Sequence, residues 1–154
     1  MDDRLFDVSG KVAVVTGGAG VLCSKMSLAL GERGVKVAVL DLRQEAAEAV
    51  AAKIRQSGGE AKGYSANVLD RASMEKAKEE VLRDYGTVDI LINGAGGNKP
   101  EATTSAKLSF FDLQPEAIQW VFNLNIIGTI IPSQVFGKVM VDKGKGSIIN
   151  MSSM

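Results

Sequence analysis

The fold is indicated first by the stretch from Val12 to Cys23, which reads VAVVTGGAGVLC. Its apolar first part is continuous instead of alternating, which is typical of a strand buried on both faces. The glycines that follow, Gly17, Gly18 and Gly20, permit positive φ and let the main chain approach a ligand closely. A helix that begins after them offers unpaired N–H groups and a positive dipole end to a phosphate. Such a turn also occurs where a chain only bends, so the stretch alone leaves both alternatives open.

The same two patterns recur along the rest of the chain. Apolar runs predict strands over 11–16, 35–40, 89–93 and 147–151, and a weaker strand is predicted over 61–66. Apolar residues at helical spacing predict helices over 21–33, 43–57 and 71–85, and a long helix from Pro115 towards Met140. Asp70 is placed to cap the third helix, and Pro132 is expected to kink the long one. Strands that alternate with helices predict a doubly wound α/β fold with a parallel sheet.

Composition and charge exclude several classes of function. The chain has 154 residues, of which 45% are hydrophobic, so it is long enough for one domain with a sizeable core. Lys plus Arg and Asp plus Glu both number 18, which gives no net field to attract nucleic acid or an anionic membrane. No histidine is present, so we expect no metal site of the histidine type. One cysteine, no signal segment and no long apolar run predict a cytoplasmic protein without a membrane span.

Small and polar residues stand at the carboxyl ends of the predicted strands. Besides the glycine turn, these are Asp41, Asn67, the run from Asn93 to Gly96, and Ser152 with Ser153. In an open parallel sheet, ligands bind beyond the carboxyl ends of the strands, where the strand order reverses. Each of these residue types is also common in ordinary turns. Their joint occurrence at one edge therefore carries the prediction of a dinucleotide site.

Asp41 follows the glycine turn at close to the spacing of an acidic residue that binds the adenosine ribose. Its carboxylate would repel a 2′-phosphate at short range, which favours NAD over NADP as the cofactor. Arg43, two residues later, could still neutralise such a phosphate. The alternative is that Asp41 only caps the helix that begins near Arg43.

Five motifs follow one another along the chain: 11-KVAVVTG-17, Asp41, 93-NGAG-96, 125-NIIG-128 and 146-GSIINMSS-153. In this order they resemble the amino-terminal part of the short-chain dehydrogenase/reductase family. The resemblance implies a Rossmann-type sheet with the strand order 3-2-1-4-5, truncated after its fifth strand. It also implies one NAD(P)-binding domain over residues 1–154 that is incomplete at its carboxyl end. The loop 96–104 and the turn 16–23 are most similar to sugar-acid enzymes of the D-mannonate or fructuronate oxidoreductase type.

The resemblance implies a role for particular residues. Gly17 and its neighbours would hold the pyrophosphate, Asp41 the ribose, and Asn67 with Val68 the adenine. The complete set of implied cofactor-binding residues is Thr16, Gly17, Gly18, Gly20, Val21, Leu22, Asp41, Leu42, Asn67, Val68, Asn93, Gly94, Ala95 and Gly96. No metal site is implied.

Two catalytic residues are also implied. Asn125 matches the asparagine that fixes a kinked helix and orients a proton-relay water, and Ser153 matches the serine that hydrogen-bonds the substrate oxygen. Read without the family, Asn125 could only kink its helix, and Ser153 could be an ordinary residue at a strand end.

The chain departs from the family pattern at four of these positions. Val21 and Cys23 stand where the family turn has glycines, Asn67 replaces an aspartate, and Gly94 replaces a second asparagine. A buried packing role is expected for Cys23, and the alternative is a thiol with a lowered pKa at a helix start.

The family's catalytic tyrosine, with a lysine four residues later, is not found. Val68 follows Tyr64 at that spacing, and Asp89 follows Tyr85. We therefore expect the 154-residue chain to be inactive by itself. The full-length parent is expected to be an NAD(P)-dependent homo-oligomer that exchanges hydride with a small hydroxyl or ketone substrate, a sugar acid or polyol. A non-catalytic dinucleotide-binding module and an inert remnant remain the alternatives.

Overall fold

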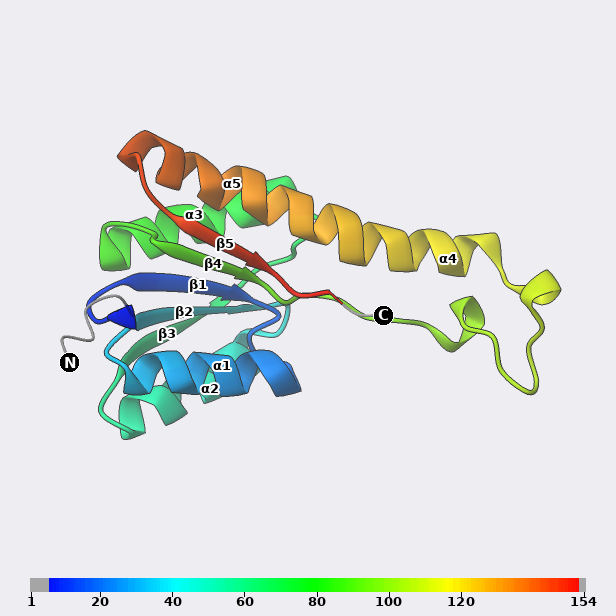
Figure 1. Ribbon diagram of the computed structural model, residues 1–154, viewed down its shortest axis with the longest axis horizontal. Coiled ribbons are helices and arrows are strands. Elements are labelled where there is room, and N and C mark those ends of the chain that lie inside the picture. The colour runs from blue at the N-terminus through cyan, green and yellow to red at the C-terminus, as the bar shows by residue number, and fades with distance from the viewer. Residues whose placement is uncertain (1–5, 153–154) are drawn as a thin grey trace.

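The chain forms one parallel sheet with helices on both of its faces (Figure 1). This computed structural model describes residues 6–152. The strands are β1 (Val12–Thr16), β2 (Lys36–Asp41), β3 (Glu60–Ser65), β4 (Ile90–Asn93) and β5 (Ser147–Asn150). The α-helices are α1 (Val21–Glu32), α2 (Gln44–Gln56), α3 (Arg71–Tyr85), α4 (Pro115–Phe122) and α5 (Gly128–Lys143). The sheet order is β3-β2-β1-β4-β5 with every pair parallel, which confirms the predicted fold class and strand order.

Local sequence signals set the element boundaries. The carboxylate of Asp70 accepts a hydrogen bond of 2.9 Å from the backbone N–H of Ala72, so it caps α3 as predicted. Gly86 ends the same helix with φ of 75°, and Gly34 follows α1 with φ of 75°. Only glycine adopts these values without strain, and each one turns the chain back towards the next strand.

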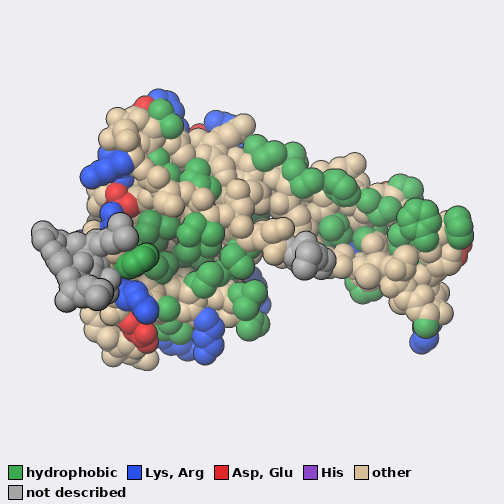
Figure 2. All heavy atoms as spheres, in the orientation of Figure 1, with side chains coloured by type: hydrophobic (Ala, Val, Ile, Leu, Met, Phe, Trp, Pro, Cys, Tyr) green, Lys and Arg blue, Asp and Glu red, His purple; other side chains and the backbone are tan. Residues whose placement is uncertain are grey.

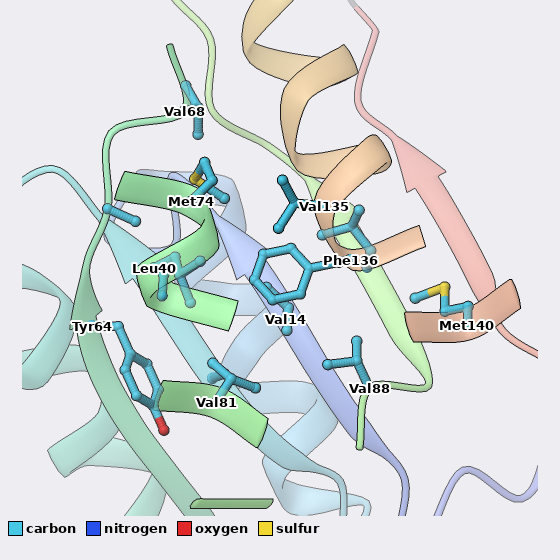
Figure 3. Packing of buried hydrophobic residues seen from close by; sticks show 14 residues of the cluster. Val14, Leu40, Tyr64, Val68, Met74, Val81, Val88, Val135, Phe136 and Met140 are labelled. Atoms are coloured by element: carbon cyan, nitrogen blue, oxygen red, sulfur yellow. The ribbon is translucent and has the colours of Figure 1, made fainter. Parts of the chain in front are cut away.

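The core consists of two layers, one on each face of the sheet. Val14 of β1 points to the face covered by α3 and α5, where it meets Leu40, Met74 and Phe136 (Figure 3). Its neighbours Ala13 and Val15 point to the face covered by α1 and α2. All five residues of β1 are buried, which explains why its apolar run is continuous.

The predicted long helix is interrupted by a π-helical turn. The turn Asn123–Ile127 joins α4 to α5, whereas Pro132, the expected site of a kink, lies inside α5. By length and composition, the whole segment Pro115–Lys143 could cross a membrane, but core helices share both properties. The α5 half packs against α3 and β4 and contributes Val135, Phe136 and Met140 to the core.

The α4 half of this segment projects away from the sheet as an arm (Figure 1). The loop that leads to it contains two short 3₁₀ helices, Pro100–Ala102 and Phe110–Asp112. Phe110 and Phe111 stack edge to face near the end of the arm and are largely exposed. Figure 2 shows further apolar side chains along the arm.

Candidate functional site

The carboxyl ends of the strands border two hollows that share one wall. The first has a volume of about 280 Å³, and Gly17, Asp41 and Asn67 line it. The second has a volume of about 660 Å³, and Leu22 and Asn125 line it. The shared wall is the segment 94–96, which follows β4. An elongated ligand can therefore extend from one hollow to the other along this segment.

The glycine turn lies against this segment with no room for side chains. Gly17 has φ of 60°, and a β-carbon there would lie 2.8 Å from the Cα of Ala95. A β-carbon at Gly18 would lie 2.6 Å from a methyl carbon of Val39. The N–H of Gly18 donates to the carbonyl of Leu40 at 2.9 Å, which fixes the turn to the end of β2. The glycines therefore bring backbone to the cleft where a side chain would block it.

The start of α1 is suited to a negatively charged group. Gly20 is the N-cap and provides no side-chain acceptor, and the first turn of the helix contains no acidic residue. Val21 and Leu22 begin the helix with largely exposed side chains. The N–H groups of this turn and the helix dipole favour an anion, so the residues fit a cofactor pyrophosphate.

Asp41 connects the end of β2 to the glycine turn. Its Oδ2 accepts from the N–H of Ala19 at 3.2 Å, and its Oδ1 accepts from the N–H of Arg43 at 3.2 Å. The Nε of Arg43 lies 4.0 Å from the same Oδ1, and the Arg43 side chain is 78% exposed. The carboxylate thus lines the first hollow, while the guanidinium reaches into solvent.

The remaining predicted residues of the first hollow follow β2 and β3. Leu42 and Val68 both line it, beside Asn67. The Oδ1 of Asn67 accepts from the N–H of Leu69 at 3.0 Å, and its backbone N–H donates to the Oγ of Ser73. These bonds hold the chain after β3 in a turn that faces the cleft.

Thr16 and Asn93 are two of the predicted residues that lie beneath the cleft instead of lining it. The Oγ1 of Thr16 accepts from the N–H groups of Gly94 and Ala95 at 3.2 and 3.3 Å, so it anchors the shared segment from below. Asn93 is also buried, and its Nδ2 donates to Ser133 and to the Oδ1 of Asn150, each at 2.8 Å. Asn93 therefore ties β4 to both α5 and β5.

Asn125 lies in the π-helical turn, opposite the shared segment. Its Nδ2 donates to the carbonyls of Gly97 at 2.7 Å and Val121 at 2.8 Å, while its Oδ1 accepts from the N–H of Gly97 at 3.3 Å. A β-carbon at Gly96 would lie 2.7 Å from that Oδ1. The side chain thus holds the loop after β4 against the helix, and a π-helical turn at this point presents it to the cleft.

The two tyrosines lie away from both hollows. The hydroxyl of Tyr64 donates to Asp84 at 2.7 Å beside Lys62. Burial, followed by the bond to Asp84, raises the pKa of Tyr64 far above its ordinary value, and burial raises the pKa of Tyr85 to about 12. Both groups therefore stay protonated at neutral pH as part of the packing of β3 against α3.

Cys23 is a buried packing residue, as expected. Burial, and to a lesser extent the nearby Asp41 carboxylate, raises the pKa of its thiol. Burial and the carboxylate therefore both oppose thiolate formation at this helix start.

The structure brings most of the predicted site residues together. Those that line a hollow are Gly17, Gly20, Leu22, Asp41, Leu42, Asn67, Val68, Gly94, Ala95, Gly96 and Asn125. Thr16, Gly18 and Asn93 are buried beneath the hollows, and Val21 is exposed at the start of α1. Ser153 lies outside the described residues.

The sequence prediction missed Asn98, Val121 and Thr129, all of which line the second hollow. Thr129 follows Asn125 by one helical turn and donates to its carbonyl at 2.9 Å, so helical spacing could have identified it. Asn98 lies in the irregular loop, where no periodic pattern points to the cleft.

A parallel sheet in this order, with a glycine turn after β1 and a cleft at its carboxyl edge, defines a Rossmann-type α/β protein. The family model for short chain dehydrogenase matches residues 11–154. The chain belongs to the short-chain dehydrogenase family, which confirms the resemblance found in the sequence.

Two bacterial oxidoreductases are similar to almost the whole of this chain. The chain is 44% identical to an uncharacterized oxidoreductase of Haemophilus influenzae and 46% identical to the uncharacterized oxidoreductase UxuB of Bacillus subtilis. Each match covers 96% of this chain and 55% or 56% of the relative, so the chain spans just over half of their length.

Two NAD-bound crystal structures are also similar. One is described as a D-mannonate oxidoreductase from Haemophilus influenzae, with a TM-score of 0.89 and 43% identity over 96% of this chain and 56% of that one. The other is a xylitol dehydrogenase with a TM-score of 0.86 and 29% identity over 95% and 54%.

Proposed function

We propose that this chain is the cofactor-binding part of an NAD-dependent oxidoreductase that exchanges hydride with the hydroxyl or ketone group of a small molecule. One observation carries the proposal: two hollows at the carboxyl edge of the sheet share the segment 94–96, with Asp41 in one and Asn125 in the other. A dinucleotide has two nucleoside halves joined by a pyrophosphate, and this cleft offers a place for each part.

The first hollow suits the adenosine half. Asp41 would accept hydrogen bonds from the ribose hydroxyls, while Leu42, Asn67 and Val68 would enclose the adenine. A 2′-phosphate placed there would meet the Asp41 carboxylate at close range, which supports NAD over NADP. Arg43 is the nearby cation that would lessen this preference.

The glycine turn and the start of α1 would hold the pyrophosphate. Gly17, Gly18 and Gly20 would allow its close approach, and Val21 and Leu22 begin the helix whose N–H groups face it. Thr16 would keep the turn and the segment 94–96 in register from below.

The second hollow suits the nicotinamide half and the substrate. The bound nicotinamide would supply the hydride acceptor or donor of the reaction. Gly94, Ala95 and Gly96 would form the wall beside the ring, supported by Asn93, while Asn125 would hold the loop that closes this side. The hydroxyl of Ser153 would donate a hydrogen bond to the substrate oxygen.

A sugar acid or a polyol is the proposed substrate class. The structural relative described as a D-mannonate oxidoreductase supports a sugar acid, and the xylitol dehydrogenase supports a polyol. Asn98 and Thr129 place polar groups in the second hollow, which suits a ligand rich in hydroxyl groups.

Two further proposals concern the protein in isolation and in assembly. The 154-residue chain should not turn over substrate, because Tyr64 is committed to Asp84 and neither tyrosine lines a hollow. The full-length protein should form a homo-oligomer, which is supported by exposed apolar side chains along the arm (Figure 2). Ile118 and Phe122 of α4 are among the exposed apolar residues.

Titration of the chain with NADH tests the proposal, with NADPH as the comparison. Saturable binding of NADH and weaker binding of NADPH are expected, and Asp41→Ala should weaken NADH binding about tenfold. Glu45→Ala, a nearby carboxylate that lines neither hollow, is the matched control and should bind NADH like the unsubstituted chain.

Different results would support the alternatives. A folded chain that binds NADH but lacks activity with sugar acids or polyols, even within its full-length protein, would indicate a non-catalytic binding module. A chain that neither melts cooperatively nor binds NADH would indicate an inert remnant.

A further inference from the structure

Cys23 and Gly94 are in direct contact across the cleft floor, although 94 belongs to the loop after β4 and 23 to the first turn of α1. A β-carbon at Gly94 would lie 2.1 Å from the sulfur of Cys23. No pair of side chains tolerates such a distance, so the thiol occupies the space that any larger residue at 94 would need.

The position of the sulfur is fixed by its surroundings. Cys23 is buried in the cluster under α1, together with Val15 and Ile92 from the two central strands. A side chain at close packing density has few alternative rotamers, and one rotamer is rare in helices. The thiol therefore acts as a rigid spacer instead of a flexible group.

Three contacts connect the turn and α1 to the shared segment 94–96. The Thr16 hydroxyl binds the N–H groups of Gly94 and Ala95, and the backbone of Gly17 lies against Ala95. Both of these come from the end of β1 and the turn. Cys23 provides the contact from α1 itself, whose first turn faces the proposed pyrophosphate.

We propose that Cys23 is a positioning residue: its sulfur, packed on Gly94, sets the spacing between the first turn of α1 and the segment that both hollows share, and so determines the affinity for a ligand that spans them. This inference rests on the proposed function. Cys23 lines neither hollow, so it acts through Gly94 and α1 without contacting the cofactor.

A double-mutant cycle separates this role from simple packing. Gly94→Ala places a methyl group against the sulfur and 3.1 Å from the carbonyl oxygen of Thr16. Cys23→Ala removes the sulfur and leaves its β-carbon 3.7 Å from that methyl, an ordinary van der Waals contact. The double variant Cys23→Ala/Gly94→Ala should therefore relieve the clash created by Gly94→Ala alone.

The experiment measures dissociation constants for NADH, which would span both hollows. Gly94→Ala should weaken NADH binding about tenfold or more, while the double variant recovers most of the loss. Cys23→Ala alone should weaken NADH binding about threefold, because it loosens the spacing. Gly137→Ala is the control, since its β-carbon would lie 3.5 Å from Ile148, at normal contact distance.

Each remaining outcome is informative. Equal loss of NADH binding in the double variant and in Gly94→Ala overturns the proposal. If Gly94→Ala does not fold, Cys23→Val against Cys23→Ser makes the same test from the other side: valine should weaken NADH binding and serine should retain it, and equal affinities overturn the spacing role.

An unsubstituted chain that folds but does not bind NADH overturns the proposed function and this role together. Normal NADH binding with no coupling between 23 and 94 overturns this role alone.

Discussion

The two edges of the sheet differ in whether a helix covers the backbone groups of the outer strand. At the β3 edge, side chains of α2 bind the backbone groups that point away from the sheet. At the β5 edge, all four residues of the strand are exposed, and within residues 6–152 the strand pairs with β4 alone. One edge is closed by its own helix, and the other is open.

Closure of the β3 edge depends on three α2 side chains. Gln44 donates to the carbonyl of Gly63, Glu48 accepts from the N–H of Gly63, and Arg55 donates to the carbonyl of Ala61. Arg55 and Glu48 also pair with each other at 2.6 Å. An edge strand with unpaired backbone groups can pair with a strand of another chain. The three α2 side chains occupy backbone groups of Ala61 and Gly63, which disfavours such pairing at the β3 edge.

The difference extends to the cleft. The smaller hollow lies on the β1-β2-β3 half, whose edge is closed, whereas Met151 beside the open edge lines the larger hollow. The proposed adenosine site therefore lies on the half of the sheet that has the closed β3 edge. The proposed nicotinamide and substrate site borders the half whose apolar residues remain exposed, including Ile148 and Ile149.

Gly63→Val should break the closed edge and have the largest effect on stability. A β-carbon at Gly63 would lie 2.4 Å from the backbone nitrogen of Glu48, so α2 would have to move as a unit. We expect a loss of about 3 kcal/mol in the free energy of unfolding, measured by urea denaturation. Gly137→Ala adds a methyl group at normal contact distance inside α5, so it should stabilise the chain by about 0.5–1 kcal/mol through helix propensity instead of destabilising it.

Lys143→Met should have the next largest effect and weaken the half with the open edge. Nζ of Lys143 donates to the Thr87 hydroxyl, the Val88 carbonyl and the Asp89 carboxylate, so it ties the end of α5 to the segment that leads into β4. We expect a loss of about 2 kcal/mol at neutral pH. Lys138→Met removes an exposed ion pair to Asp142 on the same helix. It should lower the free energy of unfolding by only about 0.3 kcal/mol.

The effect of Lys143→Met should depend on pH. Burial opposes the ionisation of Asp89, but Lys143 and the N–H of Val12 outweigh it and hold the pKa of this carboxyl below its ordinary value. A carboxyl group whose pKa is lowered by folding stabilises the folded state at pH values above its unfolded-state pKa. That stabilisation is lost as the pH falls through the folded-state pKa. The stability difference between parent and variant should therefore narrow below about pH 4, and a constant difference would contradict this role.

Glu48→Ala should reduce the closure of the β3 edge with a smaller cost, about 1 kcal/mol, because the Glu48 side chain is partly exposed. Hydrogen exchange should show faster exchange of the Gly63 amide in the variant, since that N–H loses its acceptor. Glu45→Ala, on the same helix turn, should leave this amide unchanged. Equal protection in both variants would contradict the closure described here.

Ile149→Lys should have the smallest effect on stability, within about 0.5 kcal/mol, because the residue is 48% exposed. A charge at an open edge should instead reduce association between chains. Sedimentation velocity over a range of concentrations should show less self-association than the parent. Lys62→Ile at the closed edge is the converse test and should not promote association if α2 protects that edge.

The sequence predicted the elements well, because their signals are local, whereas the strand order followed only from the family resemblance. The continuous run of β1 and the Asp70 cap required only neighbours in the chain. The long helix was predicted as one continuous element, but a π-helical turn at Asn123–Ile127 divides it, and Pro132 lies inside α5. That turn presents Asn125 to Gly97, a contact between segments that no helical periodicity encodes.

The site was predicted in the same uneven way. Strand-end residues such as Asp41 and Asn67 reach the cleft because all strands of a parallel sheet point the same way. Asn98 and Val121 were missed, because an irregular loop and a helix face become cleft walls only through tertiary packing. Cys23 and Gly94, two separate departures from the family pattern in the sequence, turn out to be neighbours in space.

The sequence by itself therefore determined the strand–helix alternation, the parallel sheet and the edge at which a ligand would bind, since hydrophobic periodicity and turn chemistry act over a few residues. The tertiary structure alone decided which residues line the two hollows, how Cys23 meets Gly94, and why α2 closes one edge of the sheet. These contacts join residues distant in the chain, and the close packing of the folded state sets their distances.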